Sequence, residues 1–163
     1  MSYHSMQYNI RPLVTPIDTT TSAVRSPVVD LASLNFCTFY VSFGSITSTS
    51  ADQAVVVTLE ASTVGASTSA TAIAFNYRLS GITTANTWDA VAAATSTGVS
   101  VGTTDDDKIL EIFVDPAYVA ANKTDGRWVA VLVTPDAGAS ATEVAVFAIG
   151  EPRYPGATMT SDT

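Results

Sequence analysis

The apolar residues of this chain fall into seven short segments that begin after Pro27 and are separated by stretches rich in Gly, Ser, Thr and Asp. Each segment has the length of a β-strand and is rich in β-branched or aromatic residues. The segments are residues 28–31, 36–43, 54–62, 71–80, 108–115, 127–134 and 142–150. Strands at this spacing predict an all-β fold, a single β-sandwich of about seven or eight strands over residues 27–163, with a jelly roll as one candidate arrangement.

The patterns within the segments assign their faces. In TAIAFNYRLS (71–80) the large apolar residues alternate with smaller or polar ones, so Ile73, Phe75 and Tyr77 are predicted to face the core. The segments FCTFYVSF (36–43) and RWVAVLVT (127–134) are apolar on both faces. That pattern is typical of a central strand, or of a strand whose outer face is covered. We expect Phe75 and Trp128 to be buried and Trp88 to be exposed.

Two further elements are predicted between these segments. Residues 83–102 are ambiguous, and the β-rich neighbourhood favours a strand over a helical turn at 88–94. Residues 116–122 (PAYVAAN) form the one helix that we predict, because Asp115 can accept from a first-turn N–H and Pro116 suits the first helical position.

The first 26 residues have no sustained period. Pro12 and Pro16 disfavour both a helix and a central strand, so we predict an extended N-terminal arm over residues 1–26. The arm carries many apolar side chains for a solvated tail, and ordering it costs roughly 1–2 kcal/mol per residue of backbone entropy. We therefore expect it to become ordered where a partner buries it, with contacts from Tyr3, Tyr8, Ile10, Arg11, Leu13, Val14 and Ile17.

Charge and composition exclude several classes of protein. The net charge of −8, with seven Lys and Arg scattered singly, leaves no basic patch for nucleic acid. No apolar stretch reaches the length of a membrane-spanning helix, and the chain does not start like a secretory signal. The hydrophobic fraction is 47% against 13% charged residues. This apolar surplus indicates burial against partners, and we expect a homo-oligomer, a dimer or trimer.

Residues able to do chemistry are few. The chain has one histidine, His4, in the aperiodic arm, and one cysteine, Cys37, which we interpret as a small core residue. Asp105, Asp106 and Asp107 precede a strand, where a solvated turn is a better interpretation than a calcium site. Paired carboxylates such as Glu60 and Glu111 could in principle serve a glycosidase, but the sequence does little to support that role. We therefore assign no catalytic, cofactor or metal site, and expect that the protein is not an enzyme.

The order of segments resembles that of a known family. An aperiodic N-terminal segment with prolines precedes VDLASLNFCTFYVSFGSIT, VVVTLEAS, AIAFNYRLSG with a following Trp, DDDKILEIFVD, RWVAVLVTPDAG and EPRYPG. Over roughly residues 8–156 the chain resembles auxiliary capsid proteins of tailed bacteriophages, the cement or decoration proteins. The resemblance implies a β-structured oligomer on the outside of the phage head that clamps major capsid subunits. It supplies no motif that assigns a role to a single residue.

The sequence thus leads to two functional hypotheses. The first is a structural virion protein, made in the host cytoplasm, that binds the major capsid protein on the capsid exterior. The alternative is a carbohydrate-binding or adhesion module on a phage fibre or surface, for which an exposed aromatic cluster near Trp88 is the discriminating feature.

Overall fold

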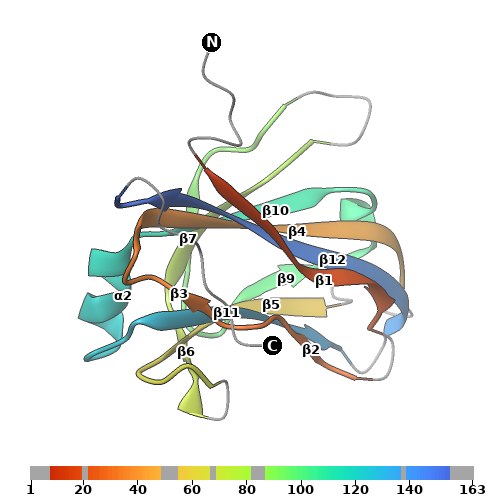
Figure 1. The fold of residues 1–163 in the computed structure, drawn as a ribbon. Coiled ribbons are helices and arrows are strands. Elements are labelled where there is room, and N and C mark those ends of the chain that lie inside the picture. The colour runs from red at the N-terminus through yellow and green to blue at the C-terminus, as the bar shows by residue number, and fades with distance from the viewer. Residues whose placement is uncertain are drawn as a thin grey trace.

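The computed structural model describes residues 8–19, 22–48, 55–66, 69–81, 87–136 and 139–154. Its strands form two antiparallel sheets that pack face to face (Figure 1), so the fold is an all-β sandwich. Sheet A has the strand order β1-β12-β4-β10-β7-β8, and sheet B has the order β2-β11-β5-β6, with β3 on β11 and β9 on β5. The strand count is therefore higher than the seven or eight predicted.

The strands of sheet A are β1 (Asn9–Asp18), β12 (Ala139–Pro152), β4 (Leu34–Ser48), β10 (Ile109–Val114), β7 (Phe75–Leu79) and β8 (Ala92–Ala94). Those of sheet B are β2 (Val24–Arg25), β3 (Val29–Asp30), β11 (Trp128–Pro135), β5 (Val55–Ser62), β6 (Thr71–Ile73) and β9 (Val99–Val101). A 3-10 turn (Thr103–Asp105) precedes β10, and helix α2 (Pro116–Asn122) follows it.

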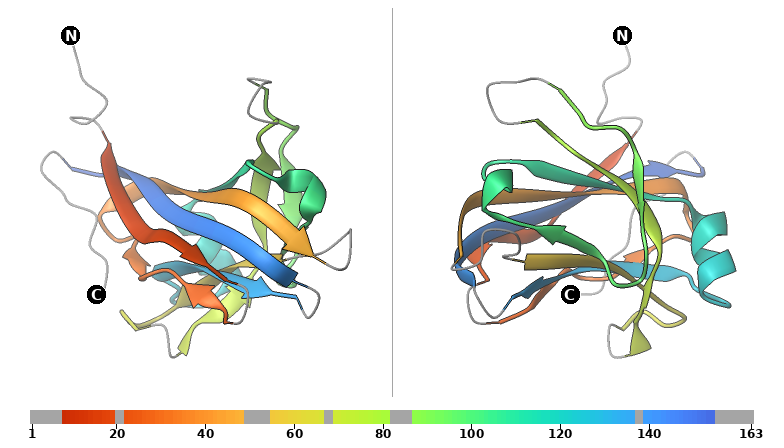
Figure 2. Two further views of the ribbon diagram at one scale, coloured as in Figure 1. Left: turned by 90° about the vertical axis from the view of Figure 1, so that its right-hand side faces the viewer. Right: turned by 180° about the vertical axis from the view of Figure 1, so that it is seen from behind.

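The core lies between the sheets, where alternate residues of each strand meet. On β4 the buried positions include Phe39 and Val41, and on β11 they include Val129, Val131 and Val133. Phe75 is fully buried, as predicted. Helix α2 closes one end of the sandwich (Figure 2) and buries Val119 in the same core. Its start confirms the sequence prediction, because Asp115 accepts a hydrogen bond from the Ala117 N–H at 2.8 Å.

The segment 71–80 contributes one strand to each sheet. Residues 71–73 form β6 beside β5 in sheet B, whereas residues 75–79 form β7 beside β10 in sheet A. The change of sheet falls at Ala74, and both Ile73 and Phe75 still face the core. A strand that passes from one sheet to the other makes a corner of the sandwich. The alternation in the sequence gives the buried face correctly and carries no signal of the change.

The N-terminal residues differ from the predicted arm. Residues 9–18 are extended, but they form β1, which pairs with β12 at the edge of sheet A. An edge strand needs hydrogen bonds on one side alone, so it tolerates Pro12 and Pro16, and the register shifts beside them. Ser26 also belongs to the sandwich, since its hydroxyl accepts from the Val131 N–H at 3.0 Å. The boundary predicted between residues 26 and 27 therefore falls inside sheet B.

The burial of Trp128 also differs from the prediction. Neighbouring Val129 is fully buried in the core, so Trp128 faces the outer side of sheet B and is half-buried there. Its ring lies against Gly65, where an added Cβ would come within 3.2 Å of it, and the Arg127 guanidinium lies 5.4 Å from its centroid. Because β11 is apolar on both faces, the sequence pattern did not distinguish the inner face from the outer one.

Candidate functional site

The outer face of sheet A carries a row of large side chains that stand opposite one another on successive strands. Phe147 of β12 is paired with Tyr40 of β4, Tyr40 with Glu111 of β10, and Glu111 with Arg78 of β7. Pro12 of β1 extends the row beyond Phe147. Five strands at the usual sheet spacing make this row roughly 19 Å long. We call it the aromatic row.

Stacking and hydrogen bonds hold the aromatic row together. The rings of Tyr40 and Phe147 are stacked, with centroids 5.0 Å apart and an interplanar angle of 10°. The Tyr40 hydroxyl donates to Glu111 Oε1 at 2.8 Å, and Arg78 Nε donates to Glu111 Oε2. Each member therefore fixes the rotamer of the next, which gives a pre-organised surface.

Glu111 is only 5% exposed, although it faces outwards. Large neighbours on both adjacent strands cover it, and a buried carboxylate is tolerated when it is paired and hydrogen-bonded. Burial, together with the hydrogen bond to Glu111 and its negative charge, raises the pKa of Tyr40 to about 12, against an opposing effect of Arg78. Tyr40 is thus a neutral donor across the physiological range.

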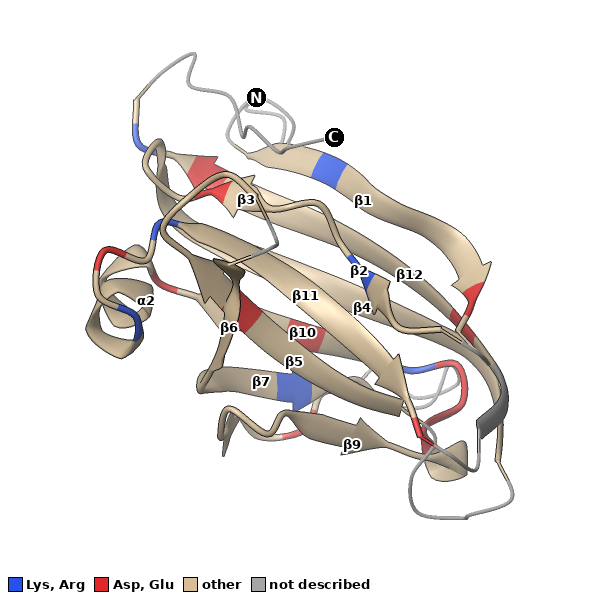
Figure 3. Cartoon of the chain, turned by 90° about the horizontal axis from the view of Figure 1, so that it is seen from below, with Lys and Arg blue, Asp and Glu red and all other residues tan. Residues whose placement is uncertain are grey.

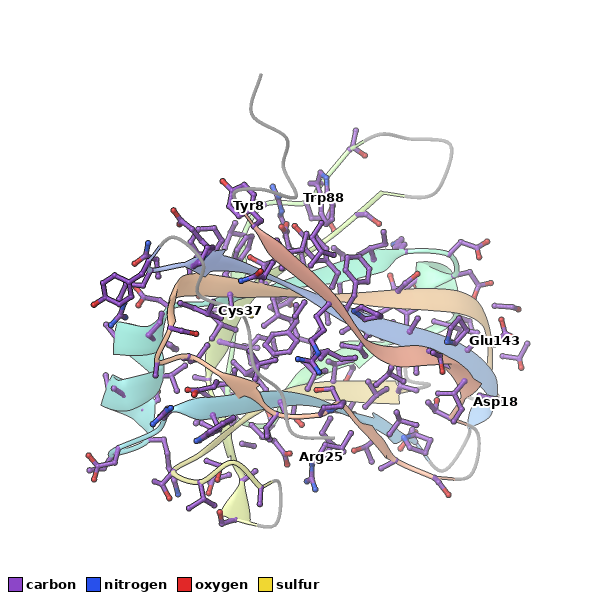
Figure 4. All side chains as sticks on the ribbon, viewed as in Figure 1. Tyr8, Asp18, Arg25, Cys37, Trp88 and Glu143 are labelled. Carbon is purple, nitrogen blue, oxygen red and sulfur yellow. The ribbon has the colours of Figure 1, made fainter. Side chains whose placement is uncertain are left out.

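Trp88 and Phe113 extend the aromatic surface at the Arg78 end. The Arg78 guanidinium lies 4.5 Å from the centroid of the Trp88 ring and 5.6 Å from that of Phe113. Trp88 is 38% exposed, as predicted. Tyr8 and Trp88 lie on the same side of the sandwich (Figure 4). Tyr8 in turn lies beside Phe36, with ring centroids 6.4 Å apart.

A pocket of about 550 Å³ opens on this face beside the aromatic row. Thr38 of β4 lies between Phe36 and Tyr40 on the same face, and its short side chain leaves space between the rings. Six large side chains line the pocket: Tyr8, Ile10, Phe36, Tyr40, Phe113 and Ile149. Glu111 and Asp115 are the charged residues in the described lining. We call this cavity the Thr38 pocket.

The residues expected to contact a capsid lie in different environments. Tyr8 and Ile10 line the Thr38 pocket, and Ile10 is 57% exposed. Ile17 is 47% exposed near the other end of β1. Leu13 and Val14 pack against the core of their own chain instead. Arg11 is half-buried on β1, and Tyr3, like His4, lies outside the described residues.

The candidate catalytic and metal groups have structural roles. Glu60 lies on the outer face of sheet B, where Arg25 binds it with two hydrogen bonds of 2.6 and 2.9 Å. Glu60 and Glu111 therefore lie on opposite outer faces of the sandwich, which rules out a shared cleft between them. Burial raises the pKa of the Cys37 thiol to about 12, so it is neither a nucleophile nor a ready metal ligand.

The three adjacent aspartates form a turn. Asp106 Oδ1 accepts from the Ile46 N–H at 2.7 Å, and Asp105 accepts from Gly102 N–H and pairs with Lys108 at 2.8 Å. Within the described ranges no cluster of three His, Cys, Asp or Glu is placed to hold a metal ion.

Figure 3 shows that charged residues are sparse along the strands of both sheets. The described helix is too short to cross a membrane.

The sequence pattern did not single out the aromatic row. A signal for it exists, because Glu111 and Arg78 are each the one charged residue of their strand. Charged residues in such positions are rarely buried without a partner. The partners themselves depend on strand order, which the sequence pattern does not contain.

Comparisons with known proteins identify no family. No protein-family model matches the chain, and no curated protein matches it significantly. A solved structure of the infectious bursal disease virus Gx strain aligns with 9% sequence identity and a TM-score of 0.16. That alignment covers 96% of this chain and 44% of the viral chain, so this chain spans less than half of the viral one. A TM-score this low carries no argument about fold or function.

Proposed function

We propose that this chain is a structural virion protein, a cement or decoration protein that binds the outside of a phage head through the outer face of sheet A. The aromatic row carries this proposal. Its rings lie on paired strands and are held by stacking and by an Arg–Glu–Tyr network. Tyr, Trp and Arg are the residues most enriched at energetic centres of protein interfaces.

Two further features support a docking role over catalysis. Glu60 and Glu111 are each committed to an ion pair, and Asp106 to a turn. The exposed Ile10 and Phe36 border the same face, and exposed apolar groups that gather on one face mark interaction sites. The identity of the partner, a major capsid protein, rests on the resemblance in segment order.

The proposal includes self-association. A cement protein gains strength from several simultaneous contacts across a lattice, so a dimer or trimer of this chain would bind more tightly than one copy. The aromatic row faces away from the core and is accessible to a capsid subunit in such an assembly.

Co-sedimentation with capsids that lack the protein tests the proposal. Phe36 is 38% exposed beside the Thr38 pocket, so Phe36→Ser should keep the fold and strongly reduce capsid occupancy. Val64, 49% exposed in the connection after β5 of sheet B, provides the matched control. Val64→Ser should bind like the wild type. If the two variants occupy capsids equally well, the outer face of sheet A is not the binding surface.

A carbohydrate-binding module is the second candidate, and one observation favours it. Trp88 is exposed in an aromatic cluster with Phe113 and Arg78, which is the feature that this alternative requires. A glycan-array screen with the wild type and Trp88→Ala tests it. Saturable binding that depends on Trp88, without capsid binding, would replace the first proposal by the second.

A further inference from the structure

The Thr38 pocket offers aromatic surface and few free hydrogen-bonding groups. Both oxygens of Glu111 already accept hydrogen bonds, from Tyr40 and Arg78. The floor belongs to β12, β4 and β10, whose backbone groups are used in the central ladders of sheet A. A ligand recognised through many hydroxyl groups would find few partners here. The pocket instead suits a ligand with an apolar stem that packs against the rings.

The charges around the pocket determine which charge is favoured on the polar end of that ligand. The charged residues in its described lining are two carboxylates, Glu111 and Asp115. Asp115 is exposed at the start of α2, where its Oδ1 accepts from the Ala117 N–H. Arg78 neutralises Glu111, which leaves Asp115 as the carboxylate without a basic partner in this lining. An anionic ligand is therefore disfavoured.

The ring faces of the pocket favour a cation as well. Aromatic rings attract a cation that approaches their faces within about 6 Å. Arg78, which does not line the pocket, already lies over Trp88 and over Phe113, one of the lining rings. Tyr8, Phe36 and Tyr40 line the pocket without any described basic residue among their lining neighbours. The net charge of −8 on the whole chain also favours a cationic ligand.

We propose that the Thr38 pocket receives a basic side chain, a lysine or an arginine, from a protein partner, with its aliphatic stem against Phe36, Tyr40 and Phe113 and its charged end toward Asp115. This inference rests on the proposed docking function and names the chemistry of the contact. It also gives a reason for Thr38 at the centre of an aromatic surface, because a larger residue there would fill the space.

Three small probes with four carbons each test the charge preference: n-butylammonium, n-butanol and n-butyrate. Each is titrated into the full-length protein while amide chemical shifts are followed by NMR. We expect n-butylammonium to shift the amides of Thr38, Phe113 and Asp115 saturably, with a dissociation constant roughly tenfold lower than that of n-butanol. We expect no saturable shift with n-butyrate. Equal binding of all three probes, or a preference for butyrate, would overturn the inference.

Two charge-removing variants localise the effect. Asp115→Asn keeps a residue that caps a helix well, so α2 should stay intact while the advantage of n-butylammonium over n-butanol disappears. Asp136→Asn removes the same charge just beyond the end of β11 and should leave that advantage unchanged. If Asp136→Asn has the larger effect, the charge preference does not originate in the pocket.

Further outcomes separate this inference from the proposed function. If maltose changes the amide chemical shifts of the pocket and n-butylammonium does not, the pocket binds carbohydrate and the inference is overturned. If the protein binds capsids but does not bind n-butylammonium, the inference is overturned and the proposed cement function is retained. A protein that binds n-butylammonium in the pocket but never binds capsids would refute the cement function while supporting the pocket chemistry.

Discussion

Tyr40 and Glu111 stand opposite each other on β4 and β10, and the Tyr40 hydroxyl donates to the buried carboxylate at 2.8 Å. The pair joins two central strands of sheet A on the face that we propose as the docking surface. It also links the ionisation of one tyrosine to the stability of the fold.

The first prediction concerns alkaline pH. The pKa of Tyr40 in the folded protein is raised to about 12, whereas a tyrosine in an unfolded chain ionises near 10. The stabilisation from this shift is complete below about pH 10 and is lost as the pH rises toward 12. Tyr40→Phe should therefore show a shallower loss of stability between pH 10 and 12 than the wild type, measured by chemical denaturation.

Tyrosine absorbance provides the control for this prediction. Tyr40→Phe should remove one tyrosine that ionises near pH 12 in the folded protein. Tyr118 is 38% exposed on α2, and Tyr118→Phe should leave that late-ionising tyrosine in place. A titration curve for Tyr40→Phe that still contains it would show that another tyrosine is responsible.

The second prediction compares two ion pairs. Arg78, 32% exposed, pairs with Glu111, whose side chain is 6% exposed, whereas Arg127, 53% exposed, pairs with Asp30, whose side chain is 9% exposed. Arg78→Met leaves a buried carboxylate without its base and should cost about 3–5 kcal/mol of unfolding free energy. Arg127→Met should cost less, because Arg127 is the more exposed of the two bases and water screens its ion pair more strongly.

Urea denaturation of both arginine variants at neutral pH measures the difference. Both substitutions remove one positive charge, so the change in net charge is matched. A larger loss of stability for Arg127→Met than for Arg78→Met would contradict the structural role that we give to Glu111.

The third prediction concerns the core. Phe75 is fully buried between the sheets, so Phe75→Ala should cost about 3–5 kcal/mol. Trp128 is half-buried on the outer face of sheet B, so Trp128→Ala should cost less despite the larger side chain. Denaturant midpoints of the two variants give the comparison. Equal losses would mean that Trp128 is more deeply buried than the structure shows.

These residues illustrate what sequence pattern can and cannot predict. Alternation around Phe75 gives the buried face of β6 and β7, and Asp115 with Pro116 gives the start of α2, because both depend on local geometry. The pattern did not give the outward position of Trp128, since both faces of β11 are apolar. The aromatic row depends on which strands are neighbours, and strand order is a property of the whole fold.

The N-terminal strand illustrates the same limit. Pro12 and Pro16 correctly disfavour a central strand, but an edge strand with register shifts is compatible with both. Whether such a segment pairs with its own domain depends on the free edge of β12, which lies more than 120 residues away in the chain.

The fourth prediction follows from β1. Leu13 packs against the core, so Leu13→Ala should lower the unfolding free energy by about 1 kcal/mol, the value expected for a half-buried leucine. Ile10 is 57% exposed, and Ile10→Ala should change stability little. Thermal melts of the two variants measure this. If Leu13→Ala melts like the wild type, β1 behaves as a separable arm after all.

The corner at Ala74 couples the unfolding of the two sheets. A single residue joins a strand of one sheet to a strand of the other, so we expect neither sheet to unfold while the other stays intact. Loosening of β6 pulls directly on β7, and through β7 on β10 and the ion pair of Glu111 with Arg78. The deep amides of both layers should therefore exchange with solvent deuterium at one common rate, as parts of one cooperative unit.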